Sequence, residues 1–228
     1  MPSEDRHSEA LEANLISDPA QQARQEARNG VRQFDLAIEQ IEYWLQPDRP
    51  FKLRPSAIMS LNRLALDGLN AFAGTYRPGG VEIKGSKHTP PGAHLVPELV
   101  EEMCEFVNSH WDRSAIHLCS YLLWRLNWIH PFTDGNGRTT RAVSFVVLCV
   151  RLGYRVPGTN TIPEQISRDK KPYYEALELA DFAYDKDKKI DVSAMETLVS
   201  SLLAKQLAFI IRDANTDQST VHATNPQH

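Results

Sequence analysis

Apolar residues recur at intervals of three and four along most of the chain, the spacing that places them on one face of an α-helix. Over residues 19–46 this stripe consists of Val31, Phe34, Ile38, Ile41 and Leu45. The same spacing predicts further helices over residues 55–69, 96–110, 114–128, 137–152, 170–182 and 193–211. We therefore expect an all-α fold class in which these stripes face a shared core.

The spacing of apolar residues changes convincingly from a helical to an alternating pattern only once. Val81, Glu82, Ile83 and Lys84 alternate between apolar and polar, and the turn-forming pair Gly85-Ser86 follows them. This pattern predicts one small β-hairpin beside the helical core. An exposed strand can pair with an extended segment of another protein through backbone hydrogen bonds, although a short hairpin can also be purely structural.

Composition narrows the class of protein. The chain has 228 residues, 42% of them hydrophobic, which is enough for one domain with a substantial core. Its net charge of -4 argues against direct nucleic-acid binding through a general basic field. The three cysteines lie in apolar, helix-like surroundings, and no apolar run is long enough to span a bilayer. We expect a cytoplasmic protein without a membrane anchor; the sequence leaves its oligomeric state open.

One segment carries the candidate chemistry: residues 130–141, with the sequence HPFTDGNGRTTR, between two apolar helices. Pro131 cannot continue the preceding helix, so the chain must turn there. Gly135 and Gly137 leave the backbone N–H groups uncovered at the point where the next helix begins. A glycine-rich turn that opens a helix is typical of an anion-binding site.

The side chains around this turn suit the transfer of a phosphate-containing group. Arg138 and Arg141 are three residues apart, so they share a helix face that could hold a polyphosphate. Asp134 would repel that phosphate unless Mg²⁺ lay between them. His130 ends the preceding helix, titrates near neutral pH and could take a proton from an attacking hydroxyl. Each residue alone has an ordinary structural explanation, but the combination favours a phosphoryl-type transfer site.

Residues 130–141 resemble the signature of the Fic (filamentation induced by cAMP) family, HPFx[DE]GNGRxxR, at every fixed position. The resemblance implies a Fic-type helical core with a β-hairpin flap beside the site, ATP and Mg²⁺ as cofactors, and AMP transfer. The acceptor would be a Ser, Thr or Tyr hydroxyl of a target protein, with pyrophosphate released. The strand over residues 81–84 stands where the family has its target-binding flap.

The resemblance also implies a role for each residue of the motif. His130 would be the base, Phe132 would point into the core, and Asp134 would hold the metal. The remaining residues would bind the phosphates; they are Gly135, Asn136, Gly137, Arg138 and Arg141. Tyr173 and Tyr174 could line an adenine pocket, although core packing is expected for at least one of them.

Many Fic proteins are inhibited by a helix with the pattern [ST]xxxE[GN], whose glutamate pairs with the second arginine of the motif. Ser8 and Glu12 are the only pair in this chain with that spacing, but Ala13 follows instead of Gly or Asn. A short inhibitory helix over residues 8–15 is one interpretation. The others are an acidic N-terminus without this role and inhibition by a separate antitoxin chain.

These patterns divide the chain into four regions. We expect an N-terminal helical segment with the inhibitory motif over residues 1–52, a Fic core over 53–190, a C-terminal helix packed on the core over 191–213, and a disordered tail over 214–228. Alternatives to AMP transfer are transfer of another phosphate-containing group, removal of AMP by the same site, or a non-catalytic nucleotide-binding regulator. The intact His130 and Asp134 disfavour the regulator, because binding alone needs no base.

Overall fold

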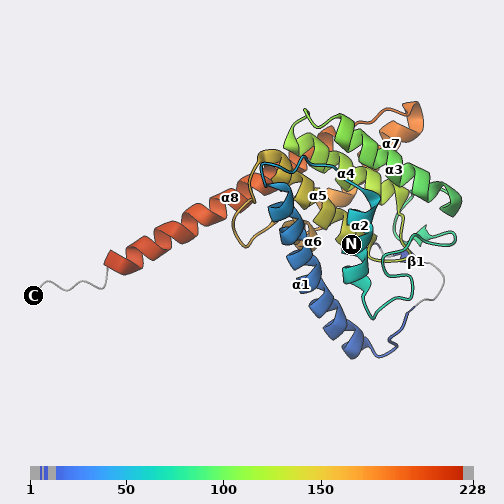
Figure 1. The fold of residues 1–228 in the computed structure, drawn as a ribbon, viewed down its shortest axis with the longest axis horizontal. Helices are drawn as coiled ribbons and strands as arrows, with labels where there is room; N and C mark the ends of the chain where they lie inside the picture. Colours follow the sequence, from blue (N-terminus) through green and yellow to red (C-terminus); the bar gives the residue numbers. More distant parts are fainter. Residues whose placement is uncertain (1–5, 7, 10–13, 223–228) are drawn as a thin grey trace, which may run out of the picture.

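The computed structural model describes residue 6, residues 8–9 and residues 14–222. Helices dominate this part of the chain, which confirms the all-α fold class (Figure 1). The elements are β1 (Ser8–Glu9), α1 (Pro19–Trp44), α2 (Pro55–Leu66), β2 (Glu82–Ile83), the 3-10 helix η1 (Ala93–Leu95), α3 (Val96–Ser109), α4 (Ala115–Ile129), α5 (Asn136–Leu152), α6 (Ile162–Arg168), α7 (Lys171–Asp187) and α8 (Ser193–His222).

Helices α4 and α5 form the centre of the fold. Both are buried around most of their circumference, as expected of helices that are apolar on nearly every side. They pack against each other, α1 and α2 cover α5, and α3, α7 and α8 cover α4. The segment between α4 and α5 is residues 130–135, so the packing of these two buried helices against each other fixes both ends of the candidate site.

Helix α1 forms over the expected residues, and Ile38, Ile41 and Leu45 of its predicted stripe pack on the core, but the prediction was wrong for the first two residues of the stripe. Val31 and Phe34 are 63% and 46% exposed, whereas Asn29 and Gln33 are buried. The amides of Asn29 and Gln33 donate hydrogen bonds to backbone carbonyls in and just after the last turns of α2. The carbonyls at a helix end need partners, so polar side chains occupy the packed face of α1 here.

Two helical features differ from the sequence prediction. Helix α6 was missed, although its capping box between Thr161 and Glu164 and the proline at its start are visible in the sequence. Helix α8 continues to His222, through residues that we assigned to a disordered tail. Neither glycine nor proline occurs between residues 193 and 222 to end it, and its last turns project from the body in Figure 1.

The expected strand is present at Glu82–Ile83, and the turn after it is closed by the Ser86 N–H donating to the Ile83 carbonyl. Its partner comes from the N-terminal end of the chain. Strand β1 pairs antiparallel with β2, with Ser8 opposite Ile83 and Glu9 opposite Glu82. Pro90 and Pro91 follow the turn and lack the N–H groups that a returning hairpin strand would need.

Ser8 is therefore extended, and the predicted helix that begins there does not form at its first residues. Glu12, the other residue of the predicted inhibitory pair, lies outside the described residues. The described chain resumes at Asn14, which forms a single β-bridge with Asn70, next to a hydrogen bond from the Leu15 N–H to the Leu69 carbonyl.

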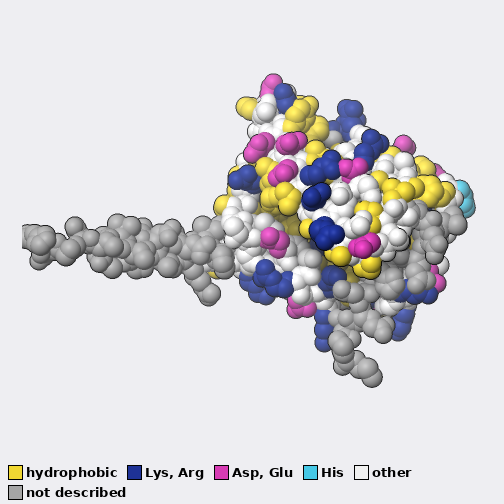
Figure 2. Space-filling view, turned by 90° about the horizontal axis from the view of Figure 1, so that it is seen from below, with side chains coloured by type: hydrophobic (Ala, Val, Ile, Leu, Met, Phe, Trp, Pro, Cys, Tyr) yellow, Lys and Arg dark blue, Asp and Glu magenta, His cyan; other side chains and the backbone are white. Residues whose placement is uncertain are grey.

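The surface carries charges of both signs. On the face shown in Figure 2, Lys and Arg side chains are interspersed with Asp and Glu side chains, without one field of a single sign. No helix of the described residues combines the length and the apolar character that crossing a membrane requires.

Candidate active site

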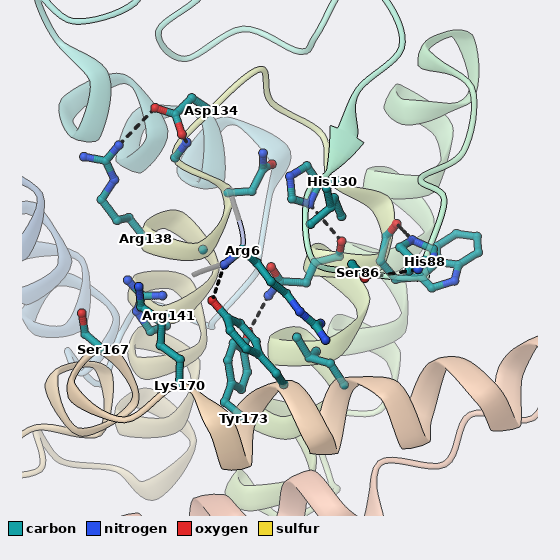
Figure 3. Close-up of a pocket in the computed structure, with 18 of the residues that line it drawn as sticks. Arg6, Ser86, His88, His130, Asp134, Arg138, Arg141, Ser167, Lys170 and Tyr173 are labelled. Carbon is teal, nitrogen blue, oxygen red and sulfur yellow. Dashed lines mark hydrogen bonds and ion pairs between the residues drawn. The ribbon is translucent and has the colours of Figure 1, made fainter. Parts of the chain in front are cut away.

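A cavity of about 350 Å³ lies where the end of α4, the start of α5, β2 and α7 meet. This volume is within the range of small-molecule sites. The catalytic and phosphate-binding residues expected from the motif all line it: His130, Asp134, Gly135, Asn136, Gly137, Arg138 and Arg141. Figure 3 shows Arg138 and Arg141 on one side of this cavity and His130 on the other. Of the expected flap residues, Ile83 reaches its wall.

His130 stands at the end of α4 in a left-handed conformation, with φ of 51°. Its own N–H still closes the last helical turn, 3.0 Å from the Leu126 carbonyl, while Pro131 cannot donate a further bond. The side chain is buried, and its Nδ1 lies 3.3 Å from the Asn127 carbonyl. Donation from Nδ1–H to this carbonyl makes Nε2 the basic nitrogen of the ring.

Burial lowers the pKa of His130 to about 4, and the positive charge of Arg77 acts in the same direction. The carbonyl of Asn127 opposes the shift only in part. The imidazole is therefore neutral at pH 7, the protonation state that a general base requires.

Arg77 holds the segment that carries His130, and sequence reasoning missed it. The guanidinium donates from Nε to the His130 carbonyl at 2.8 Å, from one terminal nitrogen to the Gly79 carbonyl at 2.8 Å, and from the other to the Pro91 carbonyl. The Arg77 N–H also donates to the Pro131 carbonyl at 2.9 Å. The side chain is 3% exposed, and burial lowers its pKa. Arg77 thus ties the His130 turn to both flanks of β2.

Two asparagines shape the turn between α4 and α5. The Asn136 amide accepts from the Phe132 N–H at 3.0 Å and donates to the Phe132 carbonyl at 2.9 Å, while the Phe132 ring is fully buried as expected. Asn62, on α2, donates to the Asp134 carbonyl at 3.1 Å and to the Thr139 hydroxyl at 3.2 Å. Asn62 is buried in an apolar helix, and its residue type alone gave no signal of this role.

The glycines leave room that no other residue would. Gly135 precedes α5 with φ of 71°, and a Cβ there would lie 3.1 Å from the Asn62 amide nitrogen and 3.3 Å from Leu66. A Cβ on Gly137 would lie 3.1 Å from the guanidinium of Arg141. The first N–H groups of α5 lack acceptors within their own helix and open onto the cavity, so the helix dipole and these donors together form an anion site.

Positive charge gathers at this helix end. Arg138 lies 3.3 Å from Asp134 and 3.8 Å from Glu26 of α1. Arg141 forms no ion pair with another residue of the described chain, and burial, together with Arg138, lowers its pKa. Two guanidinium groups and a helix N-terminus in one cavity favour a polyphosphate over any neutral ligand.

Asp134 is the residue that could hold a metal ion. Its carboxylate accepts from the Gly135 N–H at 2.6 Å and its side chain is about half exposed to the cavity. Within the described residues no group of three or more His, Cys, Asp or Glu side chains could hold a metal by itself. The donor set therefore fits a hard cation such as Mg²⁺ that takes one carboxylate from the protein and its other oxygens from phosphates.

The two neighbouring tyrosines at the start of α7 lie in different surroundings. The Tyr173 hydroxyl donates to the Leu123 carbonyl at 3.1 Å and its ring is buried in the core. Tyr174 turns its ring face toward the cavity, where the guanidinium of Arg6 lies 4.3 Å from the ring centroid. Tyr174 is therefore the one of the pair that could stack on a ligand.

Comparisons with known proteins identify the family. The model of the Fic/DOC family matches residues 52–148. A protein named protein adenylyltransferase Fic, from Drosophila willistoni, is 31% identical over 156 residues, which make up 67% of this chain and 29% of the relative. The chain thus spans about three tenths of the length of the adenylyltransferases that it matches.

Solved structures show the same fold. A Fic domain containing signaling protein from Bacteroides thetaiotaomicron VPI-5482 matches with a TM-score of 0.70 at 21% identity, over 88% of this chain and 76% of that one. Fic-1 from C. elegans matches with a TM-score of 0.63 at 20% identity, over 90% and 55% of the two chains. At these identities the likeness supports the fold alone.

Proposed function

Because this chain belongs to the Fic/DOC family, we propose that it transfers AMP from ATP to a Ser, Thr or Tyr hydroxyl of a target protein. One observation carries the proposal: a buried, neutral histidine faces a cationic helix N-terminus across a single cavity. Relatives named protein adenylyltransferase support the same reaction class.

The phosphates of ATP would bind at the start of α5. Backbone N–H groups around Gly137 would hold them, and Arg138 and Arg141 would contact their outer oxygens. In this role Asn136 acts through the turn, because both polar atoms of its amide are bonded to Phe132. Asp134 would hold Mg²⁺, which when bound neutralises phosphate charge and aligns the leaving pyrophosphate.

His130 would act on the acceptor. The target hydroxyl oxygen attacks the α-phosphorus of ATP, its proton passes to Nε2 of His130, and the bond from the α-phosphorus to the bridging oxygen breaks. Pyrophosphate leaves with the electron pair, beside Arg138 and Arg141. Since burial keeps the pKa of His130 at about 4, the ring accepts this proton only as the bond to phosphorus forms.

The target would be held by the flap, residues Val81, Glu82, Ile83 and Lys84. Ile83 lines the cavity, so a segment paired with β2 runs past His130. Backbone pairing would position an acceptor hydroxyl with little demand on its neighbouring side chains.

Two labelled nucleotides distinguish this reaction from its alternatives. Purified protein is incubated with a lysate and ATP labelled at the α-phosphate or at the γ-phosphate, and protein-bound label is measured. Label from the α-phosphate alone supports AMP transfer. Label from the γ-phosphate means transfer of a whole phosphate. No label from either, with ATP bound, excludes both transfers and leaves removal of AMP or a nucleotide-binding regulator.

A further inference from the structure

The N-terminal segment, here Arg6, Ser8 and Glu9, occupies two parts of the candidate site at once. Ser8 and Glu9 form the strand paired with β2, and Arg6 lines the cavity. Figure 3 draws Arg6 between Arg141 and His130. This segment is separated from β2 by more than 70 positions in the sequence, so its placement is a tertiary contact and not a local turn.

Arg6 is held by a subsite on α7. Its guanidinium forms an ion pair with Glu178 and stacks 4.3 Å from the centroid of the Tyr174 ring. Its backbone N–H lies 3.4 Å from the Tyr174 hydroxyl. The Arg6 side chain is 11% exposed, far less than a typical surface arginine, so the cation–π contact is shielded from water.

A second carboxylate lies close to this subsite. Asp181 lines the same wall and accepts from Trp124 Nε1 at 2.9 Å. Burial raises the pKa of Asp181, and the hydrogen bond from Trp124 and the charge of Arg6 oppose this shift only in part. The end of the cavity beside α7 therefore favours positive charge, whereas the end at α5 favours negative charge.

We propose that Tyr174, Glu178 and β2 form one recognition surface for an extended arginine-bearing segment, and that its occupant in this chain is the chain's own N-terminal segment. The occupant competes with both substrates. The cavity-facing side of the Tyr174 ring can stack on one partner, Arg6 or a nucleotide base. Within the described chain β2 pairs only with β1, so a target that paired with the same edge of β2 would have to displace β1. This inference rests on the proposed function.

A disulfide can lock the segment in place. Directly opposed residues of an antiparallel pair are close enough for a disulfide, so oxidation should link the variant Ser8→Cys/Ile83→Cys. The matched control is Ser8→Cys/Glu82→Cys, because Glu82 lies one position out of register and on the opposite face of the strand. The native cysteines, Cys104, Cys119 and Cys149, are buried and should not interfere.

Two measurements are made on the full chain: the fraction cross-linked, from the mass under non-reducing conditions, and the Kd for ATP with Mg²⁺ before and after reduction. We expect cross-linking of the register pair, loss of ATP binding in the oxidised form and recovery on reduction. We also expect Arg6→Ala to bind ATP about tenfold more tightly, because it removes a competing cation–π contact and ion pair. Arg28→Ala, an exposed arginine on α1, should bind ATP as the unmodified chain does.

Three results would contradict parts of this proposal. Equal cross-linking of the control pair means that the segment is not docked in this register. A cross-linked protein that binds ATP normally overturns the competition. If no form binds ATP, including the reduced double-cysteine variant and Arg6→Ala, the proposed function fails and the competition fails with it. Cross-linking still reports whether the segment is docked.

Discussion

Substitution of Arg77 tests how the fold holds His130 in place. Its guanidinium bonds the carbonyls of His130, Gly79 and Pro91, and the buried setting keeps water from replacing it. Arg77→Met removes these bonds while filling most of the volume. Arg77→Lys keeps the charge, but one ammonium group cannot reach carbonyls on opposite sides of a planar guanidinium.

The structure gives the magnitude. A buried acceptor left without a partner costs about 1–3 kcal/mol, which applies in full to the His130 carbonyl and in part to the partly buried carbonyls of Gly79 and Pro91. The desolvation that lowers the pKa of Arg77 offsets part of this sum, because the variant no longer buries a charge. We expect Arg77→Met to lose about 3–5 kcal/mol of unfolding free energy and Arg77→Lys about 1–3 kcal/mol.

The assay combines urea unfolding with kinetics of AMP transfer. Since a shift of His130 by about 1 Å can cost about 100-fold in rate, kcat should fall about that far in Arg77→Lys, while the KM for ATP stays within about threefold. The matched control is Arg151→Met, which also loses bonds to two backbone carbonyls, but exposed ones that water can satisfy. A stability loss below about 1 kcal/mol in Arg77→Met, or a change in KM alone, would show that Arg77 does not hold His130 in place.

Three further changes probe the turn between α4 and α5. The imidazole of His130, followed by NMR with His130→Asn for assignment, should titrate near pH 4, and titration near pH 6.5 would contradict its burial. Because the pKa of His130 is lower in the folded than in the unfolded chain, its contribution to the free energy of unfolding falls as the pH drops from about 6.5 toward 4. Asp134→Ala should abolish the Mg²⁺ dependence of ATP binding measured by calorimetry. If the unmodified chain binds ATP equally well with and without Mg²⁺, Asp134 does not act as a metal ligand. Gly135→Ala should lose about 1–2 kcal/mol in urea unfolding, since its φ is 71° and its Cβ would crowd Asn62; an unchanged midpoint would show that the turn adapts.

The sequence predicted the helices that follow a regular spacing of apolar residues and the site residues that lie together in one motif. The helices around residues 130–141 follow their apolar periods, and the motif residues converge because α4 and α5 are buried on nearly every side. Helix α1 shows the limit: its packed face carries Asn29 and Gln33, whose partners are backbone carbonyls that no side-chain pattern reveals.

The residues that support the site could not be predicted from the sequence for the same reason. Arg77 and Asn62 act almost entirely on backbone carbonyls of segments far away in the sequence, so their residue types carry no signature. The pairing of β1 with β2 is likewise a long-range contact between two-residue strands. A period-two pattern can locate a strand such as β2, but it cannot identify the partner strand.

The central claim is that His130 accepts the proton during AMP transfer while other groups hold the nucleotide. Mass spectrometry of a lysate incubated with ATP, Mg²⁺ and either the unmodified chain or His130→Ala tests it most directly, alongside the ATP Kd of both proteins. We expect Ser, Thr or Tyr peptides heavier by one AMP group with the unmodified chain, none with His130→Ala, and similar ATP affinities for the two proteins. Equal modification by His130→Ala, or peptides heavier by a phosphate alone, would contradict it.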